Sequence, residues 1–221
     1  MFFVYFVVKK MKQLLIATNN KGKVQELQDL LKDLHVQLVT PADINLNLDV
    51  HEDGLTYAEN AAKKAIAFAN ASGLVSLADD SGLEVDALDG APGLYSARYG
   101  SPDGNKLTDG ERRKLLIQNL GPFPRPWTAR FKATIAIAIP SSHVTLSETK
   151  GLQITEGFCE GEIIPEERGT GGFGYDPIFL FPELGKTMAE LGMDEKNRLS
   201  HRARAVMKAR NILRTVLGNA G

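Results

Sequence analysis

Two adjacent carboxylates, Asp79 and Asp80, have the clearest capacity for chemistry in this 221-residue chain. They follow the apolar run of residues 74–78, which has the composition of a buried strand, and they precede Ser81 and Gly82. Beyond the end of a strand in an open α/β sheet, two carboxylates could hold Mg²⁺, or one could take a proton from water. The same residues are typical of an Asp-Ser-Gly turn, in which the side chains bond only to the backbone. Taken alone, the stretch favours the turn. The choice between a turn and a chemical site therefore depends on the other candidate residues.

A polar loop near the start of the chain is a candidate anion site. It carries Thr18, Asn20 and Lys23, follows a predicted strand at residues 13–17, and precedes a helix with an apolar face. Free N–H groups and the positive end of the helix dipole favour an anion at such a point, and a lysine adds a full charge. The glycine spacing does not match a Walker A loop. A plain strand-to-helix connection with solvated lysines is the alternative.

An acidic loop before the next predicted helix offers a second carboxylate, Glu52. Thr56 and Glu59 have the spacing of a capping box, which predicts a helix to about residue 72. Lys64 lies one helical turn after Asn60, so both side chains can address one point. Glu52, just ahead of a helix and among acidic neighbours, is a candidate second metal ligand, and Lys64 is a candidate binding residue. The alternatives are an ordinary acidic loop and a solvated lysine.

The glycine-rich residues 169–177 could surround a planar ring. Phe173 and Tyr175 flank Gly174 and could stack on a ring, and Asp176 could accept a hydrogen bond from a ring N–H. A bulged hairpin corner with core aromatics is the alternative. Further on, Ser200 is a natural helix cap that places His201 and Arg202 in a first turn. The helix dipole opposes an arginine there, so a nearby anion or a keto oxygen would explain it.

The remaining pattern predicts the elements that must position these residues. Strand-helix units occupy the first half, with separate strands at residues 74–78 and 83–88 and a capped helix at residues 108–120. Strands are predicted at residues 131–139, 144–149, 151–164 and 178–181, and a last helix runs to about residue 217. The proline-dense residues 122–126 are a candidate lobe boundary. The pattern indicates an α/β protein with a mixed sheet.

Composition limits the classes of function. The chain is 43% hydrophobic with a net charge of -1, which argues against a general nucleic-acid or membrane-surface binder. Its one cysteine, Cys159, fits a reducing, cytoplasmic setting. Residues 1–10 are apolar but too few to span a bilayer, and they have no signal-peptide pattern. We expect them to be an upstream-start extension before Met11.

Taken together, the motifs resemble the XTP/dITP diphosphatase family, also called inosine triphosphate pyrophosphatases. They occur in the family's order and cover the chain from about Met11 onward: Thr18-x-Asn20-x-x-Lys23, Glu59-Asn60-Ala61 with Lys64, Ala78 to Leu83, Gly90-Ala91-Pro92-Gly93, Tyr95 to Tyr99, Gly169 to Phe179, and Ser200-His201-Arg202. Asn19 departs from the glycine that members often have, and asparagine tolerates the left-handed backbone better than most residues. The first ten residues lie outside the family pattern.

The resemblance implies an elongated α/β fold whose mixed sheet is flanked by helices, with two lobes and a central cleft in one domain over residues 11–221. It implies a homodimer that hydrolyses ITP, dITP and XTP to the monophosphate and pyrophosphate with Mg²⁺. A related pyrophosphatase for other modified nucleotides, or a non-catalytic nucleotide-binding module, is the alternative.

The resemblance also implies a role for each candidate residue. Asp80 would be the general base and, with Glu52, a ligand of Mg²⁺. Phosphate would be bound by Thr18, Asn20, Lys23, Lys64, Ser81 and Lys196. The base would be bound by Phe173, Gly174, Tyr175, Asp176, His201 and Arg202.

Overall fold

The computed structural model describes residues 11–101, 107–141 and 151–218. Its strands are β1 (Gln13–Ile16), β2 (Gln37–Val39), β3 (Val75–Val85), β4 (Trp127–Ala138), β5 (Leu152–Ile163), β6 (Phe179–Phe181) and β7 (Lys186–Thr187). Its α-helices are α1 (Lys21–Leu31), α2 (Tyr57–Ser72), α3 (Asp109–Leu120), α4 (Met193–Leu199) and α5 (His201–Val216). Short 3₁₀ turns join them: η1 (Lys32–Leu34), η2 (Ala42–Ile44), η3 (Asp86–Leu88), η4 (Gly93–Arg98), η6 (Asp176–Ile178) and η7 (Met188–Glu190).

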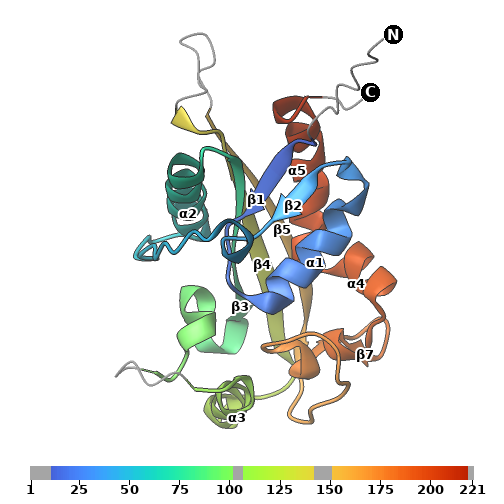
Figure 1. Cartoon of the computed structure of the whole chain (residues 1–221). Coiled ribbons are helices and arrows are strands. Elements are labelled where there is room, and N and C mark those ends of the chain that lie inside the picture. Colours follow the sequence, from blue (N-terminus) through green and yellow to red (C-terminus); the bar gives the residue numbers. More distant parts are fainter. Residues whose placement is uncertain (1–10, 102–106, 142–150, 219–221) are drawn as a thin grey trace, which may run out of the picture.

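The strands form one seven-stranded mixed sheet in the order β2-β1-β3-β4-β5-β6-β7 (Figure 1). β1 runs parallel to both β2 and β3, whereas the pairs from β3 to β7 are antiparallel. This confirms the predicted α/β class with a mixed sheet flanked by helices. The division into two lobes stays a prediction, and residues 122–126 connect α3 to β4.

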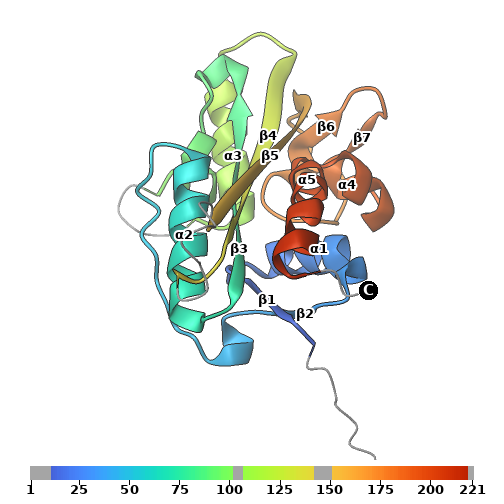
Figure 2. The same cartoon turned by 90° about the horizontal axis from the view of Figure 1, so that it is seen from above.

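Helices cover both faces of the sheet (Figure 2). On one face α1 and α5 pack against Leu14, Leu77 and Ile135. On the other face α2 packs against Ala78 and Ala136. A further apolar cluster joins α3 to the strands at the far end of the sheet, around Trp127 and Phe179.

The strand that carries the acidic pair differs from the prediction. Residues 74–78 and 83–88 were expected as two strands interrupted by a turn, but β3 runs without a break from Val75 to Val85. Backbone pairing explains this, because β4 pairs with β3 throughout, including Asp80 with Thr134. The turn interpretation of Asp79 and Asp80 is therefore wrong.

The helix caps follow the sequence signals closely. Thr108 and Glu111 form the predicted capping box of α3, and Ser200 Oγ accepts a hydrogen bond from Ala203 N at 3.2 Å. At α2, Thr56 caps as expected, but the Glu59 carboxylate accepts from Leu55 N instead of Thr56 N. Helix α4 was not predicted. The strand expected at residues 144–149 and the extension at residues 1–10 lie outside the described residues.

The outer edge of β5 is covered by side chains of α5. β6 pairs with β5 only at Glu162 and Ile163. Nearer the start of β5, Arg204 donates to the Phe158 carbonyl at 2.9 Å and Lys208 donates to the Glu156 carbonyl at 2.7 Å. Gly157 lies between them, where a Cβ would come within 2.3 Å of the His201 carbonyl oxygen. The absence of a side chain at Gly157 thus lets α5 approach the strand.

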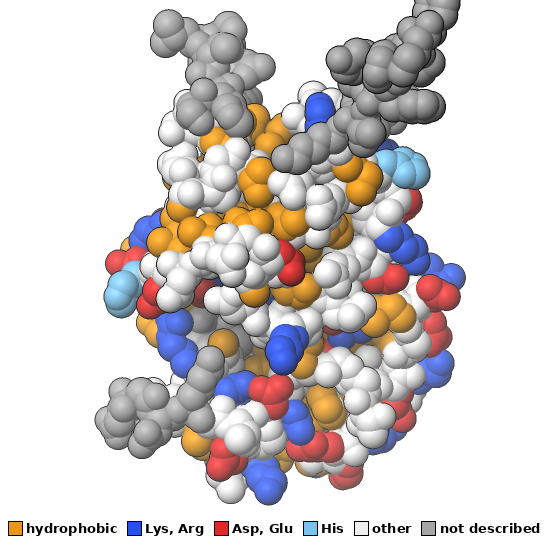
Figure 3. All heavy atoms as spheres, in the orientation of Figure 1, with side chains coloured by type: hydrophobic (Ala, Val, Ile, Leu, Met, Phe, Trp, Pro, Cys, Tyr) orange, Lys and Arg blue, Asp and Glu red, His pale blue; other side chains and the backbone are white. Residues whose placement is uncertain are grey.

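Charged side chains of both signs are intermixed over the lower part of the face drawn in Figure 3. No single sign of charge dominates that face. The distribution agrees with the net charge of -1 over the whole chain.

Candidate active site

A cavity of about 490 Å³ gathers most of the predicted site residues. It is lined by residues from both ends of the chain and from β3 between them. The predicted residues among its lining are Asn20, Lys23, Glu52, Lys64, Asp80, Ser81, Phe173, Gly174, Tyr175, Asp176, His201 and Arg202. Thr18 and Lys196 are not among the lining residues.

Strand alternation directs the adjacent carboxylates to opposite faces of the sheet. Successive side chains of a strand point to opposite faces. Asp79 therefore shares the α1/α5 face with Leu77, and Asp80 shares the α2 face with Ala78. The two neighbouring carboxylates therefore lie in different environments.

The β3 backbone edge beside the acidic pair is bound by two lysines. β1 pairs with β3 only as far as Leu77, so the next outward carbonyl has no strand partner on that side. That carbonyl, of Asp79, accepts hydrogen bonds from Lys23 Nζ at 3.3 Å and Lys64 Nζ at 3.1 Å. Lys64 Nζ also lies 2.8 Å from Glu52 Oε1. Two cations and a carboxylate therefore converge next to Asp80.

Asp80 has the properties of a proton acceptor. Burial raises its pKa, the charges of Lys23 and Lys64 oppose that rise only in part, and Glu52 adds to it. Ser81 N donates to Asp80 Oδ1 at 3.1 Å. None of the ion pairs within the described ranges involves Asp80. Asp80 is 8% exposed and lines the cavity, and its carboxylate has no direct cationic partner among the described residues.

Asp79 is held in a buried ion-pair network. Its carboxylate lies 2.6 Å from Lys23 Nζ and 2.8 Å from Arg202 Nε. Ser81 Oγ also donates to Asp79 and accepts from Arg202. Burial alone would raise the pKa of Asp79, but the charges of Arg202 and Lys23 outweigh it and hold that pKa well below its ordinary value. Asp79 therefore stays ionised and is fully engaged.

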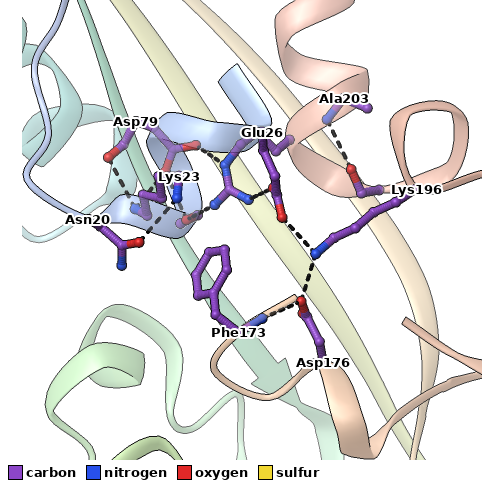
Figure 4. Close-up of polar contacts among 11 residues, drawn as sticks. Asn20, Lys23, Glu26, Asp79, Phe173, Asp176, Lys196 and Ala203 are labelled. Atoms are coloured by element: carbon purple, nitrogen blue, oxygen red, sulfur yellow. Dashed lines mark hydrogen bonds and ion pairs between the residues drawn. The ribbon is translucent and has the colours of Figure 1, made fainter. Parts of the chain in front are cut away.

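The network continues through Glu26, which the sequence analysis missed (Figure 4). Glu26 pairs with Arg202, and its other oxygen lies 2.6 Å from Lys196 Nζ. Lys196 in turn lies 2.7 Å from Asp176 Oδ2. Glu26 and Asp79 are the anions that compensate Arg202 at the start of α5. The available signal was that Glu26 lies four residues before Leu30, on the buried side of α1.

Phe173 lies between the first turn of α1 and this network. Its ring centroid is 5.6 Å from both Lys196 Nζ and Arg202 Cζ. A Cβ on Gly22 would approach the ring to 2.4 Å. Phe173 N donates to Asp176 Oδ2 at 3.0 Å, so Asp176 fixes the backbone beneath the ring.

The four other side chains predicted to contact a base already have partners within the protein. Tyr175 OH donates to the Ser96 carbonyl at 3.0 Å, and Asp176 and Arg202 are ion-paired. His201 stacks on Phe131 with ring centroids 4.7 Å apart. Burial, with the charge of Arg202, lowers the pKa of His201 well below its ordinary value, so the imidazole is neutral at pH 7. Its Nδ1 has no hydrogen-bond partner within the described part of the chain.

The remaining predicted phosphate ligands lie at the rim of the cavity or behind its wall. Asn20 Oδ1 accepts from Lys23 N at 3.1 Å and so caps α1. Thr18 Oγ1 accepts from Asn20 N at 3.2 Å and shapes the same loop. Lys196 is 5% exposed between Glu26 and Asp176 and is enclosed by carboxylates. Its Nζ lies 5.6 Å from the centroid of the Phe173 ring.

Residues 14–212 match the sequence profile of the Ham1 family. The chain belongs to this family. Its relatives include proteins named dITP/XTP pyrophosphatase from Desulforamulus reducens, 47% identical over 91% of this chain and 95% of that protein, and from Thermus thermophilus, 46% identical over 88% of each. Solved structures of Ham1 proteins from Coxiella burnetii and Staphylococcus aureus superimpose with TM-scores of 0.78 and 0.76. They are 37% and 36% identical, and the matches cover 92% and 93% of this chain and 98% and 100% of theirs. The likeness to the Ham1 fold extends over nearly the whole chain.

Two features of this Ham1-family chain bear on its possible partners. Among the residues that the structure describes, no group of three or more His, Cys, Asp or Glu side chains could hold a metal ion. No helix within the described ranges is long and apolar enough to cross a membrane.

Proposed function

We propose that this chain hydrolyses non-canonical purine nucleoside triphosphates, namely ITP, dITP and XTP, to the monophosphate and pyrophosphate. The relatives named dITP/XTP pyrophosphatase support the substrate class. The observation that carries the proposal is a single cavity whose lining includes Lys23, Lys64 and Asp80 together with Phe173. The lysines and the carboxylate match a polyphosphate, and the aromatic ring matches a planar base.

Asp80 takes a proton from the water that attacks the triphosphate. A buried carboxylate with a raised pKa is a better base than an ordinary one, and its position beside two lysines brings water close to phosphate. Lys23 and Lys64 stabilise the charge that shifts toward the leaving pyrophosphate. We assign the outer contacts with the triphosphate to Thr18, Asn20 and Ser81.

Glu52 and Asp80 fit a magnesium ion that arrives with the substrate. Mg²⁺ prefers oxygen ligands and is commonly held by one or two carboxylates together with substrate phosphates. The two carboxylates Glu52 and Asp80, both in the cavity lining, agree with that mode. When bound, the ion would neutralise phosphate charge and align the leaving group. A carboxylate bound directly to a metal is a weaker base, so Glu52 carries more of the metal binding.

The aromatic part of the cavity lining selects the base. Phe173 stacks on the purine, while His201 and Arg202 lie at the edge that carries the 6-keto oxygen. An adenine 6-amino group would face a donor there, and an unpaired buried polar group costs roughly 1–3 kcal/mol, or ~10–100-fold in specificity. Lys196 acts behind Phe173, holding Asp176 and Glu26 in place.

We also propose a homodimer in a reducing, cytoplasmic setting, with no nucleic-acid or membrane partner. A separate surface groove of about 580 Å³ is bordered by Leu55 and Phe158, which are 85% and 51% exposed. Exposed apolar side chains around a groove favour a protein interface. The single cysteine, Cys159, is buried and free. Light scattering of the wild type and Phe158→Glu tests this interface, and a dimeric Phe158→Glu variant would contradict it.

Pyrophosphate release with Mg²⁺ from ITP, XTP, dITP, GTP, ATP and dUTP tests the function. We expect turnover of ITP, XTP and dITP well above that of ATP and GTP, and turnover roughly 10²–10⁴-fold lower with Asp80→Asn. Preference for dUTP would indicate a related pyrophosphatase for other nucleotides. Tight binding without turnover of any nucleotide would indicate a binding module.

A further inference from the structure

The backbone N–H and the backbone carbonyl of Gly174 are both hydrogen-bonded to helix α3. Gly174 N donates to Asp109 Oδ2 at 2.7 Å, and the Gly174 carbonyl accepts from Arg113 at 2.7 Å. Asp109 and Arg113 lie in the first turns of α3, more than 60 residues before Gly174 in the chain. One helix end therefore fixes the two peptide groups on either side of Gly174 in the glycine-rich loop.

Both side chains are themselves held in place. Asp109 pairs with Arg112, and Arg113 lies 2.8 Å from Glu167 Oε2. The capping box of Thr108 and Glu111 fixes the start of α3. The pair is thus a rigid support, which we call the α3 clamp (Asp109 and Arg113).

The loop needs such a support, because its own backbone is permissive. Gly172 and Gly174 adopt φ angles of +72° and +62°, and glycine loses more conformational freedom than other residues when it is fixed. Phe173 lies between them. Its backbone N–H is bound by Asp176 on one side, and the next peptide is bound by the α3 clamp on the other.

We propose that the α3 clamp positions Phe173 for stacking on the substrate base. Asp109 and Arg113 are positioning residues, since they act through the Gly174 backbone. This inference rests on the proposed function, in which Phe173 is the stacking platform. A pre-ordered platform improves binding because the loop entropy is lost on folding and not on binding.

The inference predicts a selective defect in nucleotide binding. In Asp109→Ala the Gly174 N–H loses its acceptor, and we expect KM for ITP to rise about tenfold, with kcat changed less than about twofold. Inhibition by inorganic tripolyphosphate, which has no base, should be unchanged. Asp109→Asn keeps an acceptor oxygen and should restore KM to within about threefold of the wild type.

Glu111→Ala is the matched control. It removes the other half of the capping box and weakens the start of α3 without touching Gly174. If Glu111→Ala lowers Tm as much as Asp109→Ala but leaves KM unchanged, helix stability is not the cause. An equal rise in KM in both variants would overturn the clamp.

A double-mutant cycle with Phe173→Ala separates the two proposals. We expect Asp109→Ala to raise KM less than about twofold in the Phe173→Ala background. The same tenfold rise in both backgrounds, or weaker tripolyphosphate inhibition, would mean that Asp109 acts independently of Phe173. If Phe173→Ala itself leaves KM unchanged, the stacking role fails and the clamp fails with it. If Phe173→Ala raises KM and Asp109→Ala does not, only the clamp fails.

Discussion

Asp79 and Asp80 show how one bond in the chain can separate two chemical roles. Both are aspartates in the same strand, yet Asp79 is paired with Lys23 and Arg202 whereas Asp80 faces the cavity beside Lys64 and Glu52. Their pKa values move in opposite directions for that reason. The ionised, fully paired member supports the site, and the unpaired member is available to water.

Asp80→Asn should lose activity and gain stability. Activity should fall roughly 10²–10⁴-fold because the general base is lost. The folded-state pKa of Asp80 is raised above 3.8, so its ionised form destabilises the fold at neutral pH, and this penalty disappears as the pH falls below that ordinary value. Pyrophosphate release at pH 7 and melting curves at pH 7 and pH 3.5 measure both effects. A lower Tm for Asp80→Asn at pH 7 would contradict the raised pKa.

Glu26→Ala should be strongly destabilising. The change leaves the neighbouring cations Lys196 and Arg202 buried without the anion between them, and breaking a buried ion pair costs about 3 kcal/mol or more. Asp33→Ala is the control, because Asp33 also pairs with an arginine, Arg210, but is exposed. Its loss should be under about 1 kcal/mol. Equal losses in urea unfolding would show that the Glu26 network adds nothing.

Most candidate site residues could be predicted because their types are unusual where they occur. Carboxylates after an apolar run, lysines at helix starts and aromatics among glycines each break a local pattern. Glu26 could not be found this way, since a glutamate within a polar helix is ordinary. Asp109 and Arg113 likewise look like helix-start and surface charges. Their roles depend on Arg202 and Gly174, which lie far away in the chain.

At the scale of elements, the sequence predicts helix caps well, but it does not predict how strands pair. Helix caps such as Thr108 and Ser200 act through neighbouring residues, so the sequence predicts them directly. The course of β3 through Asp79 and Asp80 depends on β4, some 50 residues later.

Gly157→Ala tests the crossing of β5 and α5. A Cβ there would lie 2.3 Å from the His201 carbonyl oxygen and 2.4 Å from Ala205 N, so the helix must move. We expect a loss of about 1–3 kcal/mol in the free energy of unfolding. Gly110→Ala in α3 is the control, since its nearest neighbour would be 3.8 Å away. There we expect a gain of up to about 1 kcal/mol. Equal effects of the two changes on urea unfolding would contradict the close approach.

At the scale of the whole molecule, the cavity lies where separate apolar clusters meet. Lys23 and Arg202 come from helices of the α1/α5 face, Lys64 from α2, and Tyr175 from the cluster around α3. Each cluster consists of apolar side chains that pack against one another without a ligand. The site is therefore assembled by packing, with the charged groups at the boundaries between clusters.

Removal of divalent metal should abolish activity without unfolding the chain. Glu52 and Asp80 are the proposed ligands, and neither lies within the apolar clusters that hold the fold together. We expect excess EDTA to stop pyrophosphate release, Mg²⁺ to restore it, and Tm to change by less than about 2 °C. A large fall in Tm with EDTA would indicate a structural metal, and full activity in EDTA would exclude the metal from catalysis.

The side chains that cover β5 have a consequence for solution behaviour. A long strand with free backbone groups invites a strand from another molecule, which is the first step toward ordered aggregates. Arg204 and Lys208 occupy the carbonyls of Phe158 and Glu156 and bring positive charge to that edge. An incoming strand would have to displace both cations. The basic residues of α5 thus disfavour aggregation through this edge, and this effect does not depend on bound nucleotide.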